Sequence, residues 1–401
     1  MREKLGLHCD VISGYAFSTS DWKEDGIPVV KIGNISNGED ILCNEQMQYV
    51  DEYFLDKLDK KYQITKGDVL ISLTGSHINQ PNSMVGRSCR SLSDRKYLLN
   101  QRAGKILPFD NTNKDYLYYL LSTKAIKYDI ANRAYGGANQ VNVSPKDIKK
   151  IKWDFPIIDI QEKISSFLST YDELIETNNN RIKLLEQMAE NLYKEWFVRF
   201  RFPGYENAEF EEKRPCGWIV STCKKFKTPT FFDYCELSKI GSFVRGRNIT
   251  AAEMVDGEIP VISAGLQPSG YHNQANVKGR SLSISASGAN AGYLQYNLTD
   301  IWAADCSYYQ NDNNLWFVYC TLKFLQPVIS NLQCGAAQPH VYPKNVNKLC
   351  VLKPTDELIA KFNDTVEPIF KEIEILKKKN DNLVKQRDLL LPRLMSGKLE
   401  V

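Results

Sequence analysis

The side chains most able to do chemistry in this chain are ten cysteines and four histidines, and their spacing is unlike that of a metal site. Zinc sites bring cysteine and histidine together in closely spaced pairs such as C-x-x-C. No C-x-x-C occurs here: the two nearest cysteines are Cys216 and Cys223, with no histidine beside them. The histidines are scattered, at His8, His77, His272 and His340. We therefore expect no metal site, and reduced thiols rather than disulfides.

Motifs of the common catalytic classes are also missing from the sequence. A phosphate-binding loop needs G-x-x-x-x-G-K-[ST], and the glycine-rich "GGANQ" (136–140) has no Lys-Ser/Thr after it. A hydrolase triad needs a histidine placed beside a nucleophile, and no histidine here lies in such a motif. An adenine N6-methyltransferase needs an Asn/Asp-Pro-Pro-aromatic loop for the flipped base, and the chain has no Pro-Pro. The sequence therefore predicts no catalytic residues and no cofactor bound by this chain.

Charge and length limit the remaining classes. The chain has 401 residues, enough for two or three domains, and no apolar run near the roughly 18 residues of a membrane helix. These features, without a signal-peptide core at the N-terminus, favour a cytoplasmic protein. The net charge of +3 excludes a nonspecific nucleic-acid coat, so any DNA-binding basic groups must be concentrated locally. One candidate is "GRSCRSLSDRK" (86–96), and a solvated loop is the alternative for it.

A long internal repeat organises the chain. "GANQVNVSPKDIKKI" begins at Gly137, and "GAAQPHVYPKNVNKL" begins 198 residues later (335 − 137). "VISGYAF" (11–17) returns as "FVRGRNI" (243–249), 232 residues later (243 − 11), and "KGDVLISLTG" (66–75) returns as "KGRSLSISASG" (278–288). The shrinking offset indicates two diverged copies of one domain, the second about 34 residues shorter inside (232 − 198).

Each copy reads as mixed strand and helix. Short β-rich runs bounded by Gly, Pro and Asp occur at 27–32 and 68–73, with a partner run at 282–287. Apolar residues at helical spacing predict one helix over 115–131 and one over 315–329.

Each copy then continues into a long helix with a heptad seam. The first seam, in steps of four and three, is Ile164, Leu168, Tyr171, Ile175, Asn178, Ile182, Leu185, Ala189 and Leu192. The second, 198 residues on, is Phe362, Val366, Ile369, Ile373, Leu376, Asn380, Leu383, Arg387 and Leu390. Such narrow stripes favour pairing of the two helices with each other; packing of each stripe on its own domain is the alternative. Asn178 and Asn380 fit either a register-fixing pair or a hydrated midpoint.

The predicted fold class is therefore α+β: two related mixed α/β domains separated by two long antiparallel helices, with a pseudo-two-fold internal repeat. The expected divisions are a first domain at 1–157, a first long helix at 158–199, a second domain at 200–355, and a second long helix with a tail at 356–401.

With these elements in order, the sequence resembles the specificity (S) subunits of type I restriction–modification enzymes. The resemblance is carried by "PIIDIQEKI" (156–164), "NLYKEWFVRFRFPGYE" (191–206) and "QRDLLLPRLMSGKLEV" (386–401), together with the domain openings. Two departures are Ile359, which stands where the first copy has Gln161, and Arg387, which interrupts the second seam.

The resemblance implies a non-catalytic subunit. Each of its two target-recognition domains would read one half of a bipartite site in double-stranded DNA. Its helices would set the spacer and dock two methyltransferase (M) subunits, which use S-adenosylmethionine. A restriction (R) subunit would join and cleave DNA, using ATP and Mg. No membrane partner is implied.

For a DNA reader, the expected contacts are amide, hydroxyl and guanidinium groups on loops that reach base edges or phosphates. In the first domain these are Ser76, Asn79, Gln80, Asn82, Arg87, Arg90 and Gln140. In the second they are Arg245, Arg247, Lys278, Ser287, Asn290, Tyr293 and Gln338. The repeated Gln140 and Gln338 segments cannot by themselves distinguish two targets, so they fit backbone positioning or a structural turn equally well.

A second hypothesis comes from another class: a coiled-coil adaptor whose paired domains bind proteins. Salt-sensitive binding to a bipartite duplex in the presence of competitor DNA would separate it from the DNA reader.

Overall fold

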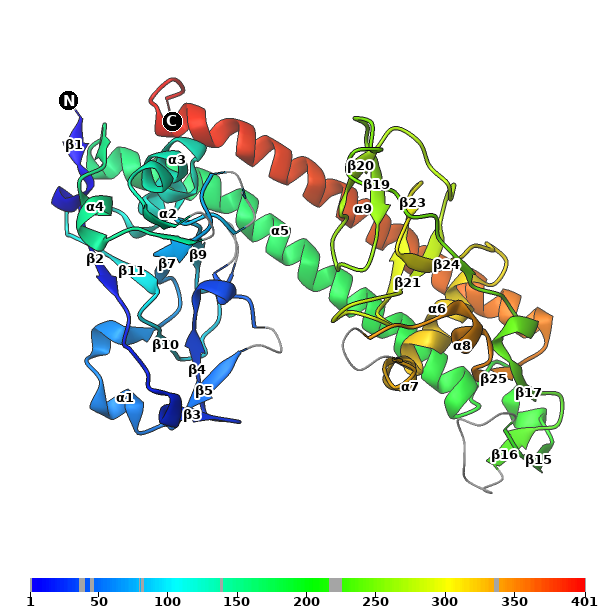
Figure 1. The fold of residues 1–401 in the computed structure, drawn as a ribbon. Coiled ribbons are helices and arrows are strands. Elements are labelled where there is room, and N and C mark those ends of the chain that lie inside the picture. Colours follow the sequence, from blue (N-terminus) through cyan, green and yellow to red (C-terminus); the bar gives the residue numbers. More distant parts are fainter. Residues whose placement is uncertain are drawn as a thin grey trace. The chain divides into compact units, whose positions relative to one another are not determined.

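The computed structural model of the chain defines residues 2–35, 40–43, 47–78, 80, 83–137, 140–215, 226–334 and 339–400. They form two compact units (Figure 1). Unit 1 comprises 1–176 together with 380–401, and unit 2 comprises 177–379. The boundary between the units passes through both long helices. Each unit therefore contains one copy of the repeated domain and part of each helix.

Unit 1 is built on two main sheets. The first has the antiparallel order β2 (Cys9–Ser13), β11 (Ala103–Pro108), β7 (Val69–Ser72) and β9 (Ser88–Arg90). The second has the order β3 (Trp22–Lys23), β5 (Gln48–Val50), β4 (Ile27–Val30), β10 (Tyr97–Leu99) and β6 (Gln63–Ile64). In it β4 and β10 are parallel, and a short helix α1 (Phe54–Lys57) packs beside them.

Two smaller sheets complete unit 1. β1 (Glu3–Lys4) pairs with β14 (Lys152–Trp153). β12 (Tyr135–Gly137), β13 (Gln140–Asn142) and β8 (Thr74–Gly75) form the other.

The helix expected over 115–131 is two helices. α2 (Lys114–Ser122) and α3 (Lys124–Asn132) are separated by Thr123. Thr123 has an extended backbone, with ψ of 143°, and its hydroxyl accepts a hydrogen bond from the Ile126 N–H. The apolar spacing continues through this break because an N-cap changes the direction of the chain without interrupting the pattern of buried residues. α4 (Pro145–Lys149) follows, with Ser144 as its N-cap.

Unit 2 repeats this scheme in shorter form. Its main sheet has the order β18 (Val244–Arg245), β24 (Cys306–Tyr309), β21 (Ser281–Ser285) and β22 (Leu294–Asn297). Its second sheet is β20 (Gly270–His272), β19 (Ile259–Ile262) and β23 (Trp302–Ala303), and β19 and β23 are again parallel. Two further pairs are β17 (Asp233–Glu236) with β25 (Cys350–Lys353), and β15 (Phe210–Lys213) with β16 (Phe226–Pro229).

The helices of unit 2 are α6 (Leu315–Phe324), α7 (Gln326–Ser330) and α8 (Pro343–Asn347). The single helix expected over 315–329 was therefore also wrong, because a break at Leu325 precedes Pro327 in the first turn of α7. Proline has no N–H to continue the preceding helix.

The repeat is confirmed by strand order and by the core. β2-β11-β7-β9 in unit 1 corresponds to β18-β24-β21-β22 in unit 2, and the parallel pair recurs in both second sheets. Within the repeated phrase, Ile148 and Ile151 are buried in unit 1, and Val346 and Leu349, 198 residues later, are buried in unit 2. The end of the phrase is repeated because both domains need the same core residues.

The long helices are α5 (Ile158–Tyr193) and α9 (Asp356–Met395). In unit 1 the start of α5, at Ile164 and Leu168, shares a core with the end of α9, at Leu394 and Met395. In unit 2 the end of α5, at Ala189, shares a core with residues of α9 such as Val366 and Ile373. The helices are therefore antiparallel, which confirms the predicted fold class. Each core also contains residues of its own domain, so helix pairing and domain packing occur together.

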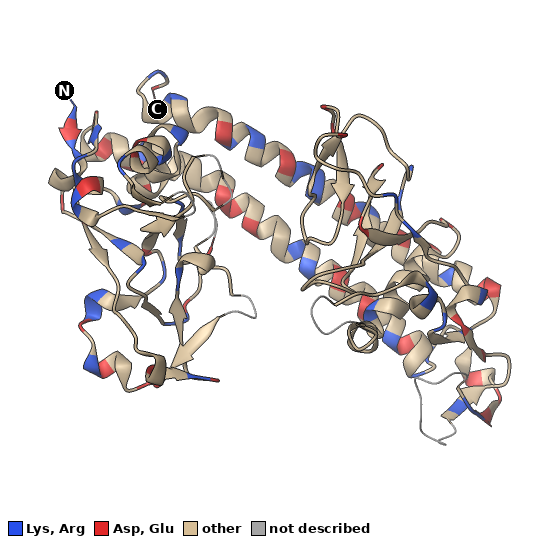
Figure 2. Cartoon of the chain, viewed as in Figure 1, with Lys and Arg blue, Asp and Glu red and all other residues tan. Residues whose placement is uncertain are grey.

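Charges of both signs lie along α5 and α9 (Figure 2). None of the eighteen seam residues is fully exposed. In the part of the chain that the structure describes, no helix has both the length and the apolar character needed to cross a membrane.

Candidate nucleic-acid interface

In unit 1 a strand pairing brings two of the expected contact segments together. β13 pairs with β8, with Val141 opposite Gly75 and Asn142 opposite Thr74. The Thr74 hydroxyl donates to Asn142 Oδ1 at 2.7 Å. The turn that begins at Ser76 therefore lies beside the hairpin that carries Gln140. Gly75 is required here, because a Cβ would lie 2.6 Å from the backbone of Ser83 and Val85.

Ser76 holds the shape of its loop. It is buried, and its hydroxyl donates to the Gln80 carbonyl at 2.9 Å and shares a hydrogen bond with the Ser83 hydroxyl at 2.7 Å. The Gln80 side chain is exposed, as is that of Gln140. Asn79 and Asn82 lie outside the described residues. Gln80 and Gln140 are thus open to solvent, and their contact with DNA stays a prediction, whereas the Ser76 hydroxyl is hydrogen-bonded within the loop.

The basic run 86–96 is not one patch. Arg87 is half-buried, and its Nη2 donates to the Ile32 carbonyl at 3.1 Å; burial lowers the pKa of its guanidinium. Arg90 lies on β9, with its side chain 12% exposed between two carboxylates. Arg95 and Lys96 are exposed. DNA contact by Arg87 and Arg90 stays a prediction, and for Arg90 it would require exchange of its carboxylate partners.

Unit 2 repeats the same juxtaposition. Ser287 forms a bridge with His340, and the Gly288 N–H donates to the Pro339 carbonyl at 3.1 Å. The loop after β21 therefore lies against the second copy of the repeated phrase, as the loop after β8 does in unit 1. Gln338 lies outside the described residues.

Arg245 and Ser287 share a carboxylate partner next to β24, and Arg247 contacts the preceding strand, β23. Asp305 accepts hydrogen bonds from both the Arg245 guanidinium and the Ser287 hydroxyl. The Arg247 N–H donates to the Ala303 carbonyl at 2.9 Å, and its exposed guanidinium lies 6.0 Å from the centre of the Trp302 ring. Trp302 Nε1 in turn donates to the Arg247 carbonyl at 2.8 Å. Trp302 and Asp305 were not expected from the sequence, because only the fold brings them beside these arginines.

The remaining expected contacts of unit 2 are spread out. Tyr293 is 42% exposed, and its N–H donates to the Asn290 carbonyl at 3.0 Å. Lys278 is exposed but precedes β21, whereas Ser287 follows it, so the whole strand separates them. In unit 1, Tyr135 on β12 is 60% exposed next to the Gln140 segment and is a further candidate that the sequence did not suggest.

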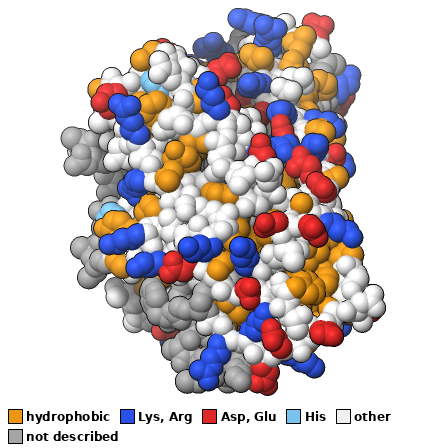
Figure 3. Space-filling model, turned by 90° about the vertical axis from the view of Figure 1, so that its right-hand side faces the viewer, with side chains coloured by type: hydrophobic (Ala, Val, Ile, Leu, Met, Phe, Trp, Pro, Cys, Tyr) orange, Lys and Arg blue, Asp and Glu red, His pale blue; other side chains and the backbone are white. Residues whose placement is uncertain are grey.

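Among the described residues, no group of three or more Cys, His, Asp and Glu side chains is arranged to hold a metal ion. Cys9 and Cys306 are buried and are not in disulfides. Burial raises the pKa of the Cys9 and Cys306 thiols to about 12, which disfavours the reactive thiolate. On the face drawn in Figure 3, basic and acidic side chains are interspersed.

Comparison with known proteins identifies the type of domain. Residues 4–187 match the family described as the type I restriction modification DNA specificity domain. This part of the chain is similar to such a domain. The MjaIX specificity subunit of Methanocaldococcus jannaschii is 27% identical over 75% of this chain and 73% of its own. The putative MjaX specificity subunit of the same organism is 26% identical over 94% of this chain and 88% of its own.

A solved structure supports the fold. The S subunit of a type I restriction–modification system from M. genitalium covers 98% of this chain and 96% of its own, with 18% identity and a TM-score of 0.53. The domain match and the two specificity subunits above confirm the resemblance to type I specificity subunits, and they support DNA sequence recognition as the function. The coiled-coil adaptor is not favoured.

Proposed function

We propose that this chain is the non-catalytic specificity subunit of a type I complex, in which each unit reads one half of a bipartite site in double-stranded DNA. The observation that carries this division is the repeated loop pairing. The loop after β8 lies beside the Gln140 segment in unit 1, and the loop after β21 lies beside Pro339 and His340 in unit 2. Two similar scaffolds with different loop side chains suit two different half-sites.

The exposed groups on these loops are of the types that read DNA. Gln80 and Gln140 in unit 1 can donate to and accept from base edges. In unit 2, Arg247 lies against Trp302, so its position is restrained while its guanidinium faces solvent. Arg245 is held by Asp305 and would bind a phosphate only by leaving that carboxylate.

The partners follow from the same proposal. Two M subunits, which bind S-adenosylmethionine, would methylate adenine, and R subunits would supply ATP- and Mg-dependent cleavage. The complex would work in the cytoplasm. The paired helices α5 and α9 would set the distance between half-sites and dock the M subunits.

Exchange of one domain tests the proposal. Residues 23–142 would be replaced by the equivalent segment of a relative, and the methylated sites of cells expressing each chain with its M subunits would be sequenced. One half-site should change while the other half-site stays. A change in both halves, or methylation by the purified chain without M subunits, would contradict the proposal.

A further inference from the structure

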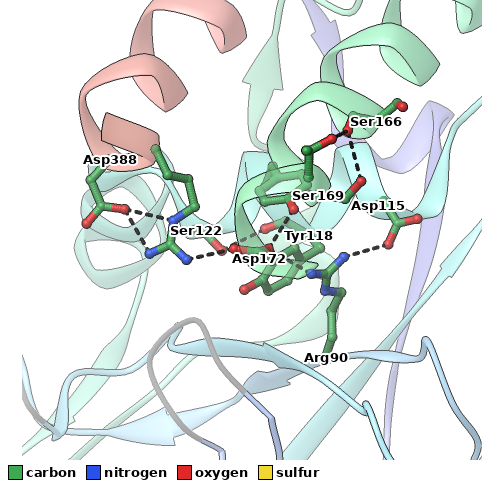
Figure 4. A network of polar contacts seen from close by, with 11 residues as sticks. Arg90, Asp115, Tyr118, Ser122, Ser166, Ser169, Asp172 and Asp388 are labelled. Carbon is green, nitrogen blue, oxygen red and sulfur yellow. Dashed lines mark hydrogen bonds and ion pairs between the residues drawn. The ribbon is translucent and has the colours of Figure 1, made fainter. Parts of the chain in front are cut away.

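Asp172 of α5 binds side chains from three other elements of unit 1, and Figure 4 shows it beside Arg90. Its Oδ2 accepts from Arg90 Nη2 on β9 at 2.8 Å and from the Tyr119 hydroxyl on α2 at 2.6 Å. Its Oδ1 accepts from Arg387 Nη1 on α9 at 2.7 Å. The exposed fractions of the Arg90, Asp172 and Arg387 side chains are 12%, 17% and 20%. A single carboxylate on α5 thus links β9, a strand of the β2-β11-β7-β9 sheet, to the other long helix, α9.

The ion pairs extend on both sides of Asp172. Arg90 Nη1 also contacts Asp115 at 3.0 Å, and Arg387 Nη2 contacts Asp388 at 2.9 Å. Arg90 further lies 4.3 Å from the centre of the Tyr118 ring. Arg90 is therefore fixed from two sides and against an aromatic face, which restricts the end of β9 to one position.

The corresponding place in unit 2 uses different chemistry. The repeat offset of 198 relates Asp172 to Phe370 (370 − 172) and Arg387 to Ala189 (387 − 189), and both counterparts are fully buried. Arg90 lies opposite Val69 in its sheet, and Tyr296 lies at the equivalent place opposite Leu282. Tyr296 contacts Phe370 with ring centres 5.6 Å apart. Unit 1 therefore has an arginine–carboxylate junction where unit 2 has an aromatic one, in which the Tyr296 hydroxyl also donates to Glu186 of α5.

This junction is one short strand away from the candidate interface. The segment from Ser76 to Arg87 leads directly into β9, which ends at Arg90. Arg87 is the last residue before β9, and its N–H donates to the Ser72 hydroxyl at 3.0 Å. The position of the last residues of the loop therefore depends on the position of β9.

We propose that Asp172 is a positioning residue for reading of the first half-site. By holding Arg90 next to α5 and α9, it fixes the position of β9, the strand that follows the loop at 76–87. This inference rests on the proposed function and adds a residue that has no contact with DNA. Reading a base edge requires placement within a fraction of an ångström, so a loosened β9 reduces base discrimination even where every contact residue is intact.

The test uses the full chain assembled with its M subunits and the variant Asp172→Asn, which keeps the shape of the side chain and removes its charge. Methylation would be measured on pools in which each half-site is randomised in turn. We expect discrimination at one or more positions of the first half-site to fall about threefold to tenfold, with the second half-site unchanged. Glu173→Gln, at an exposed neighbour on α5, is the matched control and should leave both profiles unchanged.

Arg90→Lys separates positioning from direct contact, because Arg90 is itself a predicted DNA contact. If Arg90 acts through Asp172, both single variants and the double variant relax the same positions to the same extent. If Arg90 binds DNA directly, Arg90→Lys alone relaxes them and Asp172→Asn does not, which overturns the proposal. Equal weakening on all sequences also overturns it, because that result indicates only lost stability. A parent chain without a bipartite profile would instead contradict the proposed function.

Discussion

Trp316 of α6 stacks on Phe370 of α9, with ring centres 3.7 Å apart and planes 2° from parallel. Both side chains are almost fully buried, and Trp316 Nε1 donates to Glu367 Oε2 at 2.8 Å. Phe370 lies beside the heptad seam rather than on it, so α9 uses a wider face than the seam in unit 2. Phe370 packs the helix on its own domain, and the seam residue Phe362 contacts both Tyr193 of α5 and Phe317 of α6.

Phe370→Ala should therefore destabilise unit 2 strongly. Removal of a buried aromatic ring leaves a cavity and costs about 3–5 kcal/mol. Urea unfolding followed by circular dichroism would measure the change in the free energy of unfolding. Leu389→Ala on the same helix is the control, because Leu389 is 69% exposed and its loss should cost within about 0.5 kcal/mol. Equal effects of the two variants would show that the stack does not anchor α9.

Asp68 should make the stability of unit 1 sensitive to acid. Burial alone would raise the pKa of this carboxyl, but hydrogen bonds from Lys105 and Lys114, at 2.7 and 2.8 Å, and from the Thr65 N–H outweigh burial and lower it. A lowered folded-state pKa stabilises the fold above the unfolded-state pKa of about 3.9. That contribution is lost as pH falls through the folded-state pKa.

Asp68→Asn should lower the free energy of unfolding at pH 7 and reduce its decline below about pH 4. Thermal unfolding of both proteins between pH 7 and pH 2.5 would measure this. Asp94→Asn is the control, because the Asp94 side chain is 88% exposed in its ion pair with Lys66. Parallel pH curves for the parent and Asp68→Asn would rule out this source of acid sensitivity.

Sequence patterns predicted the features that depend on local spacing. The seams of α5 and α9 were visible because their burial follows one helical period, and the domain repeat was visible because core positions such as Ile148 and Val346 are retained. In the sequence, Arg387 is the one charged residue among the apolar and amide residues of its seam. Its partner, Asp172, is adjacent to a seam position on the other helix, and only the register of two antiparallel helices brings them together.

The candidate interface was predictable only in part. The loop at Ser76 and the segment at Gln140 were each proposed from residue type, but their proximity depends on a strand pair between residues 66 positions apart (141 − 75). Arg90 illustrates the limit of residue type. In the sequence it belongs to a basic run that suits DNA, whereas in the fold two carboxylates bind it.

Arg247→Ala should weaken DNA binding by unit 2. Loss of a base contact should cost about 1–3 kcal/mol and relax one position of one half-site. Loss of a phosphate contact should weaken binding to all sequences and reduce the salt slope by about one. Binding measured at several salt concentrations, on the preferred site and on single-base variants, separates the two. Lys239→Ala, at an exposed residue of the same unit, controls for the loss of one positive charge, and an equal effect there would remove the case for Arg247.

Lengthening both helices tests whether they act as the ruler. Because α5 and α9 each continue from one unit into the other, one heptad inserted into each, after Glu176 and after Lys379, preserves the seam phase. Each helix gains about 10 Å, or roughly three base pairs at about 3.4 Å each. Three base pairs also rotate one half-site by nearly a third of a turn, so the helices must twist or the DNA must deform, at a cost of a few kcal/mol.

The variant should keep both half-site sequences, prefer a longer spacer and bind more weakly than the parent. Selection from a DNA pool with randomised spacers measures this preference, and an unchanged spacer would show that α5 and α9 do not set it.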